Sequence, residues 1–198
     1  LYRDNLRILI FVTLPVYSLL LAWAGWASWL LVGEYRSEFV FLLHVSTIGW
    51  ALNTFAAPAY FMHLGKGDVG WNTLSHVVMG VMNVALGLML GRWFGAHGVA
   101  WAYVIALATG SWLLIGLFQA RNRIGWTGWA AREHLWLAAV CAVVSVAGWL
   151  DPVRTAASEP ARFAVWLVGP PLALGLAAWF HPMRKELWHR LDLREARL

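Results

Sequence analysis

The chain of 198 residues is 61% hydrophobic and only 13% charged, and its 15 basic and 10 acidic residues give a net charge of +5. Soluble domains are about half apolar and a quarter charged, so this composition weighs against a soluble domain and indicates several membrane spans. The positive charge does not indicate nucleic-acid binding, because the basic residues lie between apolar runs and form no patch with exposed aromatic side chains.

Six apolar segments follow one another along the chain and predict helices. A membrane-spanning helix needs about 20 residues, and five of the six segments come close to that length or exceed it. The fifth segment is shorter, and we expect its helix to include residues from Ala130 onward. Strands are excluded because the segments are too long and show no alternation. The segments cover residues 8–32, 39–62, 73–91, 98–118, 135–150 and 163–181. We therefore expect an all-α, polytopic membrane bundle of six transmembrane helices.

The basic residues are distributed unevenly between the two sets of connecting loops. Because cytoplasmic loops carry the excess of Lys and Arg, both termini are predicted to be cytoplasmic, with loops 33–38, 92–97 and 151–162 outside. The richer side holds Arg3, Arg7, Lys66, Arg121, Arg123, Arg132, Arg184, Lys185, Arg190, Arg194 and Arg197. The poorer side holds Arg36, Arg92, Arg154 and Arg162.

The spans carry little that could perform covalent chemistry. No ionised side chain lies inside a predicted span, which weighs against carboxylate proton relays and against an intramembrane acid–base pair. The sequence has no phosphate-binding loop, metal-binding helix or nucleophile motif. The single cysteine, Cys141, supplies neither a disulfide framework nor a zinc site. We therefore expect no enzymatic activity, no cofactor and no metal.

The few polar residues inside the spans are the candidate site residues. Four residues on the third span form one stripe, because their spacings of four, three and four follow the helical repeat: His76, Gly80, Asn83 and Gly87. In the favoured interpretation the glycines admit a neighbouring helix and Asn83 hydrogen-bonds across the contact. In the other, His76 and Asn83 line a hydrated cavity and, with Asn53 of the second span, face polar cargo.

Two further patterns concern helix packing and bending. Ala102, Ala106 and Gly110 recur every four residues on the fourth span and favour a close helix crossing. Pro15 and the pair at residues 170–171 lie inside spans, where a missing backbone donor is expected to bend the helix.

Three stretches of the sequence together resemble a known family. The stretch LVGEYRSEF follows a proline-containing first span and resembles the FG-x-x-Y loop of bacterial polysaccharide flippases. A span ending in NTFAAPAYFMHLGKGDVGWN follows, and then MNVALGLMLGRWFGAHGVAWAYV. From Pro15 to Leu117 the succession resembles the C-terminal part of the polysaccharide-exporter branch of the multidrug/oligosaccharidyl-lipid/polysaccharide exporter superfamily. The residues that match the family pattern of a mid-helix Asn, an FG-x-x-G outer turn and an Ala-rich span are Asn83, Phe94, Gly95, Gly98, Ala100 and Ala102.

The resemblance implies a fold and a division of the chain. A full member has twelve to fourteen helices in two lobes that open alternately to each side, and this chain would supply the last six. Residues 1–118 would be four second-lobe helices, 119–134 a basic cytoplasmic loop, 135–181 two accessory helices and 182–198 a basic cytoplasmic tail. Because the first lobe is missing and the chain begins with a leucine and no signal peptide, we expect a piece of a longer protein.

The implied function is translocation of lipid-linked oligosaccharide across the bacterial inner membrane for surface polysaccharide synthesis. The partners would be that substrate, membrane lipids and the missing N-terminal lobe, with a polysaccharide polymerase and glycosyltransferases as further candidates. Two alternatives stay open: a multidrug-type exporter of the same superfamily, and a membrane assembly or scaffold subunit that transports nothing. An exporter of cationic drugs is less favoured, because the spans hold no acidic residue.

Overall fold

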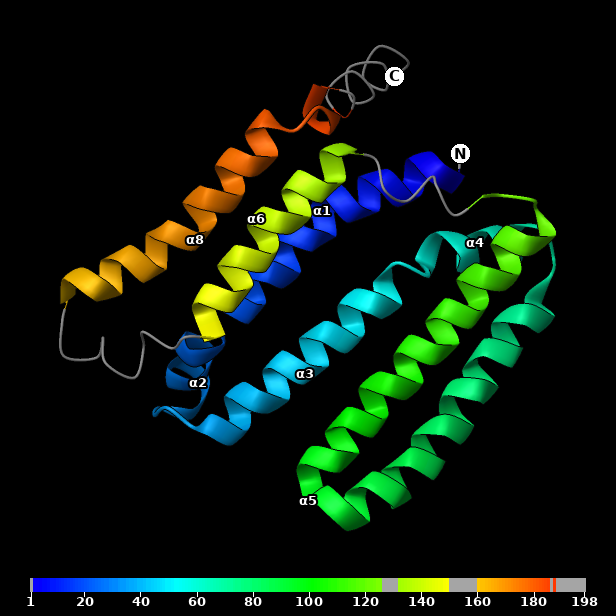
Figure 1. The fold of residues 1–198 in the computed structure, drawn as a ribbon, viewed down its shortest axis with the longest axis horizontal. Helices are drawn as coiled ribbons and strands as arrows, with labels where there is room; N and C mark the ends of the chain where they lie inside the picture. Colours follow the sequence, from blue (N-terminus) through cyan, green and yellow to red (C-terminus); the bar gives the residue numbers. More distant parts are fainter. Residues whose placement is uncertain (1, 126–131, 150–159, 186, 188–198) are drawn as a thin grey trace. The chain divides into compact units, whose positions relative to one another are not determined.

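The described part of the chain is built from helices. The computed structural model describes residues 2–125, 132–149, 160–185 and 187, and within them every regular element is a helix (Figure 1). The helices are α1 (Tyr2–Ala22), α2 (Ala24–Val32), α3 (Ser37–Thr54), α4 (Ala57–Gly65), α5 (Val69–Arg121), α6 (Arg132–Trp149) and α8 (Pro160–Phe180). The predicted all-α class is confirmed.

Several of these helices have the length and composition of membrane spans. Among the described residues, three helical stretches are long and apolar enough to cross a membrane, namely Tyr2–Ala22, Ser37–Gly65 and Val69–Arg121. Shorter apolar helices cover His134–Gly148 and Val165–Phe180. The predicted second span is divided into α3 and α4, because Pro58 in the first turn of α4 cannot donate a backbone hydrogen bond.

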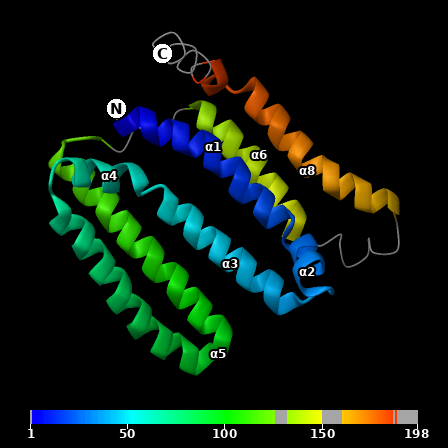
Figure 2. The same ribbon diagram turned by 180° about the vertical axis from the view of Figure 1, so that it is seen from behind.

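The helix α5 is a hairpin of two helical arms. Gly95 has φ 60° and ψ −140°, outside the helical region, and the chain reverses direction there (Figures 1 and 2). Glycine adopts this conformation without the steric penalty that a side chain would bring. Residues 69–94 (arm 1) and 96–121 (arm 2) correspond to the predicted third and fourth spans, and the predicted bend between them is confirmed.

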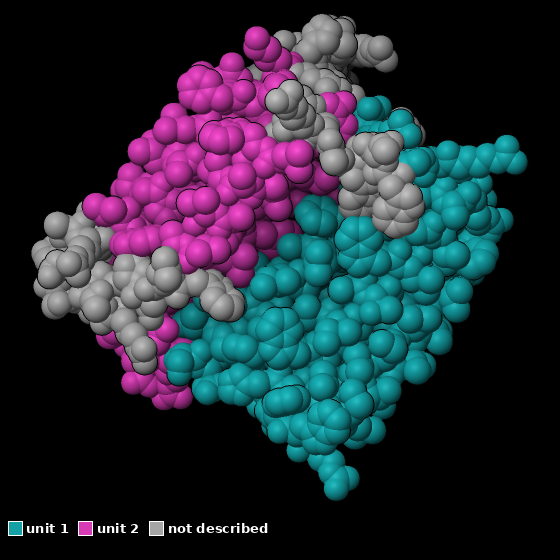
Figure 3. All heavy atoms as spheres, viewed as in Figure 1, with its two compact units in different colours: residues 1–6, 37–129 teal, residues 7–36, 130–198 magenta. Residues whose placement is uncertain are grey.

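The chain divides into two compact units. Unit 1 comprises Leu1–Leu6 and Ser37–Trp129, and unit 2 comprises Arg7–Arg36 and Ala130–Leu198 (Figure 3). The sequence-based division placed the whole first span with the next three, in residues 1–118. In the structure most of α1 and all of α2 belong with α6 and α8 in unit 2.

In unit 1, arm 2 lies between α3 and arm 1 (Figures 1 and 2). Small residues permit a close approach between arm 2 and each of these two neighbours. Ala102, Ala106 and Gly110 of arm 2 are buried, and a Cβ at Gly110 would lie 2.9 Å from the Ser75 carbonyl oxygen of arm 1. On the other side, a Cβ at Gly49 of α3 would lie 3.0 Å from a side-chain methyl of arm 2. The predicted close crossing through the small residues of arm 2 is confirmed.

The core of unit 2 forms where α1, α6 and α8 meet. It is apolar and consists of Ala22, Leu137, Cys141, Val144, Leu174 and Ala177. Ser18 Oγ donates to the Cys141 carbonyl oxygen over 2.8 Å, and Ser145 Oγ lies 3.1 Å from Ser18 Oγ. A Cβ at Gly148 would lie 2.8 Å from the Ala22 carbonyl oxygen. Hydroxyl groups and a glycine therefore bring α1 and α6 into close contact.

A proline in α8 creates one tertiary hydrogen bond of unit 2. Pro170 and Pro171 lie inside α8, which continues through both. Because Pro170 has no N–H, the carbonyl oxygen of Trp166, four residues earlier, lacks its helical donor. Trp23, at the break between α1 and α2, donates its Nε1–H to that oxygen over 3.1 Å. The indole therefore bonds a backbone acceptor that the proline leaves unsatisfied.

Replacing Trp23 by phenylalanine is expected to lower the free energy of unfolding of unit 2. The aromatic ring stays, but the Trp166 carbonyl oxygen loses its donor, at a cost of about 1 kcal/mol. Thermal unfolding in one detergent measures the effect. Trp29→Phe is the matched control, because Trp29 is 39% exposed and its indole makes no hydrogen bond in the described part of the chain. Equal losses in the two variants would contradict the role of Trp23.

Candidate functional site

The predicted stripe on arm 1 is open rather than packed. His76 and Asn83 are exposed, and a Cβ at Gly80 or Gly87 would meet nothing within 4 Å. Arm 1 uses a different face to contact arm 2, where Ser75 Oγ donates to a backbone carbonyl of arm 2 over 3.1 Å. The prediction that Gly80 and Gly87 bring a neighbouring helix close is therefore wrong for the described part of this chain.

The start of the stripe contacts α4. The His76 ring lies edge-on to Tyr60, with 6.0 Å between the ring centroids and an angle of 71°. Asn72, one turn earlier and on the buried side of arm 1, donates its Nδ2–H to the Tyr60 carbonyl oxygen over 3.1 Å. These contacts fix His76 beside α4. Asn83 lies two turns further along the same exposed face.

Asn53 is separated from the stripe by arm 2. Its Oδ1 lies 3.0 Å from the Oγ of Ser111, which is fully buried on arm 2 and also donates to its own helix. Gly110, next to Ser111, faces arm 1 instead and accepts the hydrogen bond of Ser75. Adjacent residues of arm 2 therefore face different neighbours: Ser111 faces α3, and Gly110 faces arm 1. The structure does not bring Asn53 together with His76 and Asn83.

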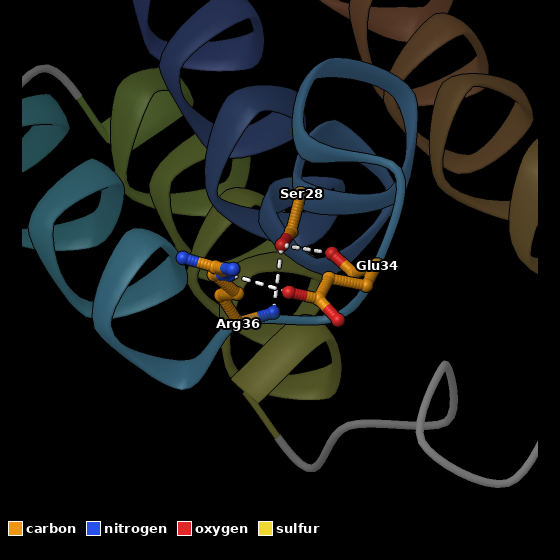
Figure 4. Close-up of polar contacts among 3 residues, drawn as sticks. All are labelled: Ser28, Glu34 and Arg36. Carbon is orange, nitrogen blue, oxygen red and sulfur yellow. Dashed lines mark hydrogen bonds and ion pairs between the residues drawn. The ribbon is translucent and has the colours of Figure 1, made fainter.

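The stretch that resembles the family's loop forms a tight turn between α2 and α3. Gly33 ends α2 with φ 83°. Ser28 Oγ donates to the Glu34 carbonyl oxygen, and the Arg36 backbone N–H donates to Ser28 Oγ, both over 2.8 Å (Figure 4). Arg36 Nε and Glu34 Oε1 form an exposed ion pair 2.6 Å apart. The Ser28 hydroxyl of α2, bonded to two backbone groups of this stretch, therefore holds the turn in place.

Side chains that the sequence pattern did not indicate as candidates gather around the buried Phe118 ring at the α4 end of unit 1: Tyr2, His63 and Gln119 are buried there, and Lys66 is exposed. The Phe118 ring lies 4.7 Å from the Tyr2 ring and 5.2 Å from the His63 ring, and Lys66 Nζ lies 5.4 Å from its centroid. Gln119 Nε2 lies 3.4 Å from the Tyr2 hydroxyl. We call Tyr2, His63, Lys66, Phe118 and Gln119 the Phe118 cluster.

Two members of the Phe118 cluster have unsatisfied polar atoms. His63 is only 2% exposed, yet neither of its ring nitrogens has a hydrogen-bond partner among the described residues. The same holds for Gln119 Oε1. His63 comes directly after the predicted second span and Gln119 directly after the fourth. Both were therefore expected in loops, and nothing in the sequence pattern indicated their burial.

Unit 2 contains two other features that could bind a ligand. His134 and His181 are buried and stack with ring centroids 5.2 Å apart, and His181 Nδ1 accepts a hydrogen bond from the Met183 N–H over 3.2 Å. An apolar groove of about 210 Å³ lies between α6 and α8, with Trp166 and Pro170 in its lining. Within the described ranges no group of three or more His, Cys, Asp or Glu is placed to hold a metal ion.

Comparison of the chain with protein-family models, with curated proteins and with solved structures finds no match in any of the three. The functional interpretation therefore depends on the geometry above and on the sequence motifs.

Proposed function

We propose that the chain is the C-terminal part of a bacterial inner-membrane flippase for lipid-linked oligosaccharide. The observation that carries the proposal is the exposed pair His76 and Asn83 on arm 1, part of a stretch long and apolar enough to span a membrane. Polar side chains on such a helix are unfavourable against lipid tails, so Asn83, in mid-helix, requires water, cargo or another protein surface, whereas His76, near the helix end, has the lipid headgroups as an alternative. The resemblance of the surrounding motifs favours the cavity between the two lobes of an exporter.

In this proposal the six predicted spans cross the membrane with both termini in the cytoplasm, and arm 1 faces the missing lobe. The polar head of the cargo passes through the hydrated cavity while its polyprenyl tail stays in lipid. No covalent step is needed, because transport requires only that the cargo stabilises the inward- and outward-facing states to different degrees. His76 and Asn83 offer hydrogen-bond donors and acceptors to the sugar. Asn53, bonded to Ser111, positions α3 against arm 2.

Replacing both His76 and Asn83 by alanine in the full-length protein is expected to reduce surface polysaccharide about tenfold. The estimate corresponds to losing two hydrogen bonds to cargo of somewhat under 1 kcal/mol each. Polysaccharide is measured on a strain that lacks the chromosomal copy, at equal protein level in the membrane. Thr109→Ala is the matched control, since Thr109 is an exposed polar residue of arm 2 that bonds its own helix. Unchanged polysaccharide in the double variant would contradict the cavity.

The open stripe also favours a second candidate function, a scaffold subunit whose partner helix covers arm 1. Gly80 and Gly87 leave room for the close approach that such helix contacts use. Bulky substitutions distinguish the two functions. Gly80→Leu in a scaffold would abolish copurification of the partner, whereas in a flippase it would lower polysaccharide export and leave the set of copurifying proteins unchanged.

A further inference from the structure

Three basic side chains gather at the α4 end of unit 1. Lys66 lies in the turn between α4 and α5, Arg121 is the last residue of α5, and Arg123 follows in the next turn. Lys66 Nζ donates to Asn122 Oδ1 over 2.7 Å, and Asn122 stands between the two arginines in the chain. All three cations are exposed. They therefore form one positive surface, which we call the Lys66 surface.

The charge of the Lys66 surface is not neutralised within the described residues. Neither Lys66, Arg121 nor Arg123 makes an ion pair there. The acidic residue of the same turn, Asp68, is at the N-terminal cap of α5, where its charge favours the start of that helix. Within the two turns that carry the Lys66 surface, residues 66–68 and 121–125, one carboxylate stands against three cations, which leaves an excess of positive charge.

Aromatic rings hold two of the cations at the ends of apolar helices. The Arg121 guanidinium lies 5.1 Å from the Trp71 ring centroid, and Lys66 Nζ lies 5.4 Å from that of Phe118. The membrane-length stretch Ser37–Gly65 ends one residue before Lys66, and Val69–Arg121 ends at Arg121 itself. Cations at the ends of spanning helices, with tryptophan beside them, lie at the depth of the lipid headgroups.

The third cation stands in an unfavourable backbone conformation. Arg123 has φ 52°, in the left-handed region, and is the residue after the C-cap of α5. The Ile124 N–H donates to the Gln119 carbonyl oxygen over 2.9 Å, and the Arg123 N–H to that of Ala120 over 3.3 Å. This pattern is a Schellman motif, whose left-handed position is usually glycine. The left-handed backbone conformation disfavours arginine, so the turn alone does not explain why arginine occupies this position. A role for its side chain does.

We propose that Lys66, Arg121 and Arg123 bind the headgroup phosphate of an anionic phospholipid at the membrane surface. Guanidinium and ammonium groups are the usual protein partners of phosphate, and basic clusters next to spanning helices bind anionic lipids. A lipid is the source of the phosphate, because all three cations stand where the apolar stretches end. The proposal does not depend on the transported cargo, and it holds for whichever membrane leaflet this end of unit 1 meets.

Lipid binding is tested on the purified full-length protein by native mass spectrometry with added phosphatidylglycerol or phosphatidylcholine. Each basic residue is expected to contribute about fivefold to phosphatidylglycerol affinity, so the variant Lys66→Gln/Arg121→Gln/Arg123→Gln should lose about a hundredfold. Phosphatidylcholine binding should stay unchanged. Arg36→Gln is the matched control, because Arg36 already pairs with Glu34. Its phosphatidylglycerol affinity should equal that of the unmodified protein.

Two outcomes would overturn the proposal. Equal phosphatidylglycerol affinity in the triple variant and the unmodified protein would show that the Lys66 surface does not bind the headgroup. Displacement of the lipid by millimolar inorganic phosphate would identify the free anion as the ligand. Because a triple variant could unfold, the charge-preserving Lys66→Arg/Arg121→Lys/Arg123→Lys is measured beside it, and it should retain lipid binding. Neither measurement uses transport, so failure here leaves the flippase proposal untouched.

Discussion

Replacing Gly98 by alanine is expected to destabilise the α5 hairpin by about 1–3 kcal/mol, near the upper end of that range. A Cβ at Gly98 would collide with the carbonyl group of Leu90 in arm 1 and lie 3.1 Å from the Gly91 nitrogen. These are backbone atoms, which cannot move aside as the end of a side chain can. The hairpin would have to open near Gly95, where the chain reverses. Thermal unfolding in one detergent measures the loss.

Gly87→Ala provides the matched control on the same helix. A Cβ at Gly87 would meet no atom of the described chain within 4 Å, and alanine favours a helix over glycine by about 1 kcal/mol. Gly87→Ala is therefore expected to leave the midpoint unchanged or to raise it. If both variants lost stability equally, then Gly87 would be covered by a surface that these residues do not show. If neither did, the close approach of the two arms would be wrong.

The faces of the two arms show what the sequence could and could not predict. Helical periodicity predicts which residues share a helix face. It correctly placed Ala102, Ala106 and Gly110 on one face, since all three are buried. It could not tell which face of arm 1 turns inward. In a soluble helix the polar side identifies the solvent, but lipid tails are as apolar as a protein core. The stripe of small residues on arm 1 was therefore interpreted as a packing face, although no helix of the described chain packs against its glycines.

The helix topology was predictable for a different reason. Length and apolar composition define most of the helices, and the glycine-rich turn predicted the reversal at Gly95. Proline was a poorer guide, because α1 and α8 continue through Pro15 and Pro170–Pro171, whereas the predicted first and second spans are interrupted at Trp23 and before Pro58. The association of α1 with α6 and α8 in unit 2 depends on contacts far apart in sequence, such as Ser18 with Cys141. No local pattern encodes that pairing. A single sequence therefore predicted the elements better than their partners.

The candidate site residues also differ in a way that the sequence pattern did not show. Asn53 was grouped with His76 and Asn83 because all three are polar residues inside apolar spans. The structure gives Asn53 a partner in Ser111 and leaves the other two exposed. A polar residue within a span satisfies its hydrogen bonds either across a helix contact or with water and cargo, and composition alone does not separate these cases. The bond to Ser111 favours a structural role for Asn53.

His63→Leu is expected to raise the free energy of unfolding by about 1–2 kcal/mol. The imidazole is buried against Phe118, and both of its nitrogens lie without a hydrogen-bond partner in the described residues. A leucine of similar size would keep the packing against Phe118 and remove two buried nitrogens that have no hydrogen-bond partner among the described residues. Asn83→Leu, on the exposed face of arm 1, is the control and should change the unfolding midpoint little. Thermal unfolding of the two variants in one detergent gives the comparison.

The same variant tests whether the imidazole at position 63 is kept for function. A His63→Leu protein that is more stable but fails to export polysaccharide would show that the imidazole is used in function, because active sites commonly keep polar groups at the expense of stability. A protein that is more stable and fully active would restrict the site to His76 and Asn83. A less stable protein would contradict the prediction, since the ring nitrogens would then have partners beyond the described residues. The Phe118 cluster would in that case belong to an interface with the rest of the protein.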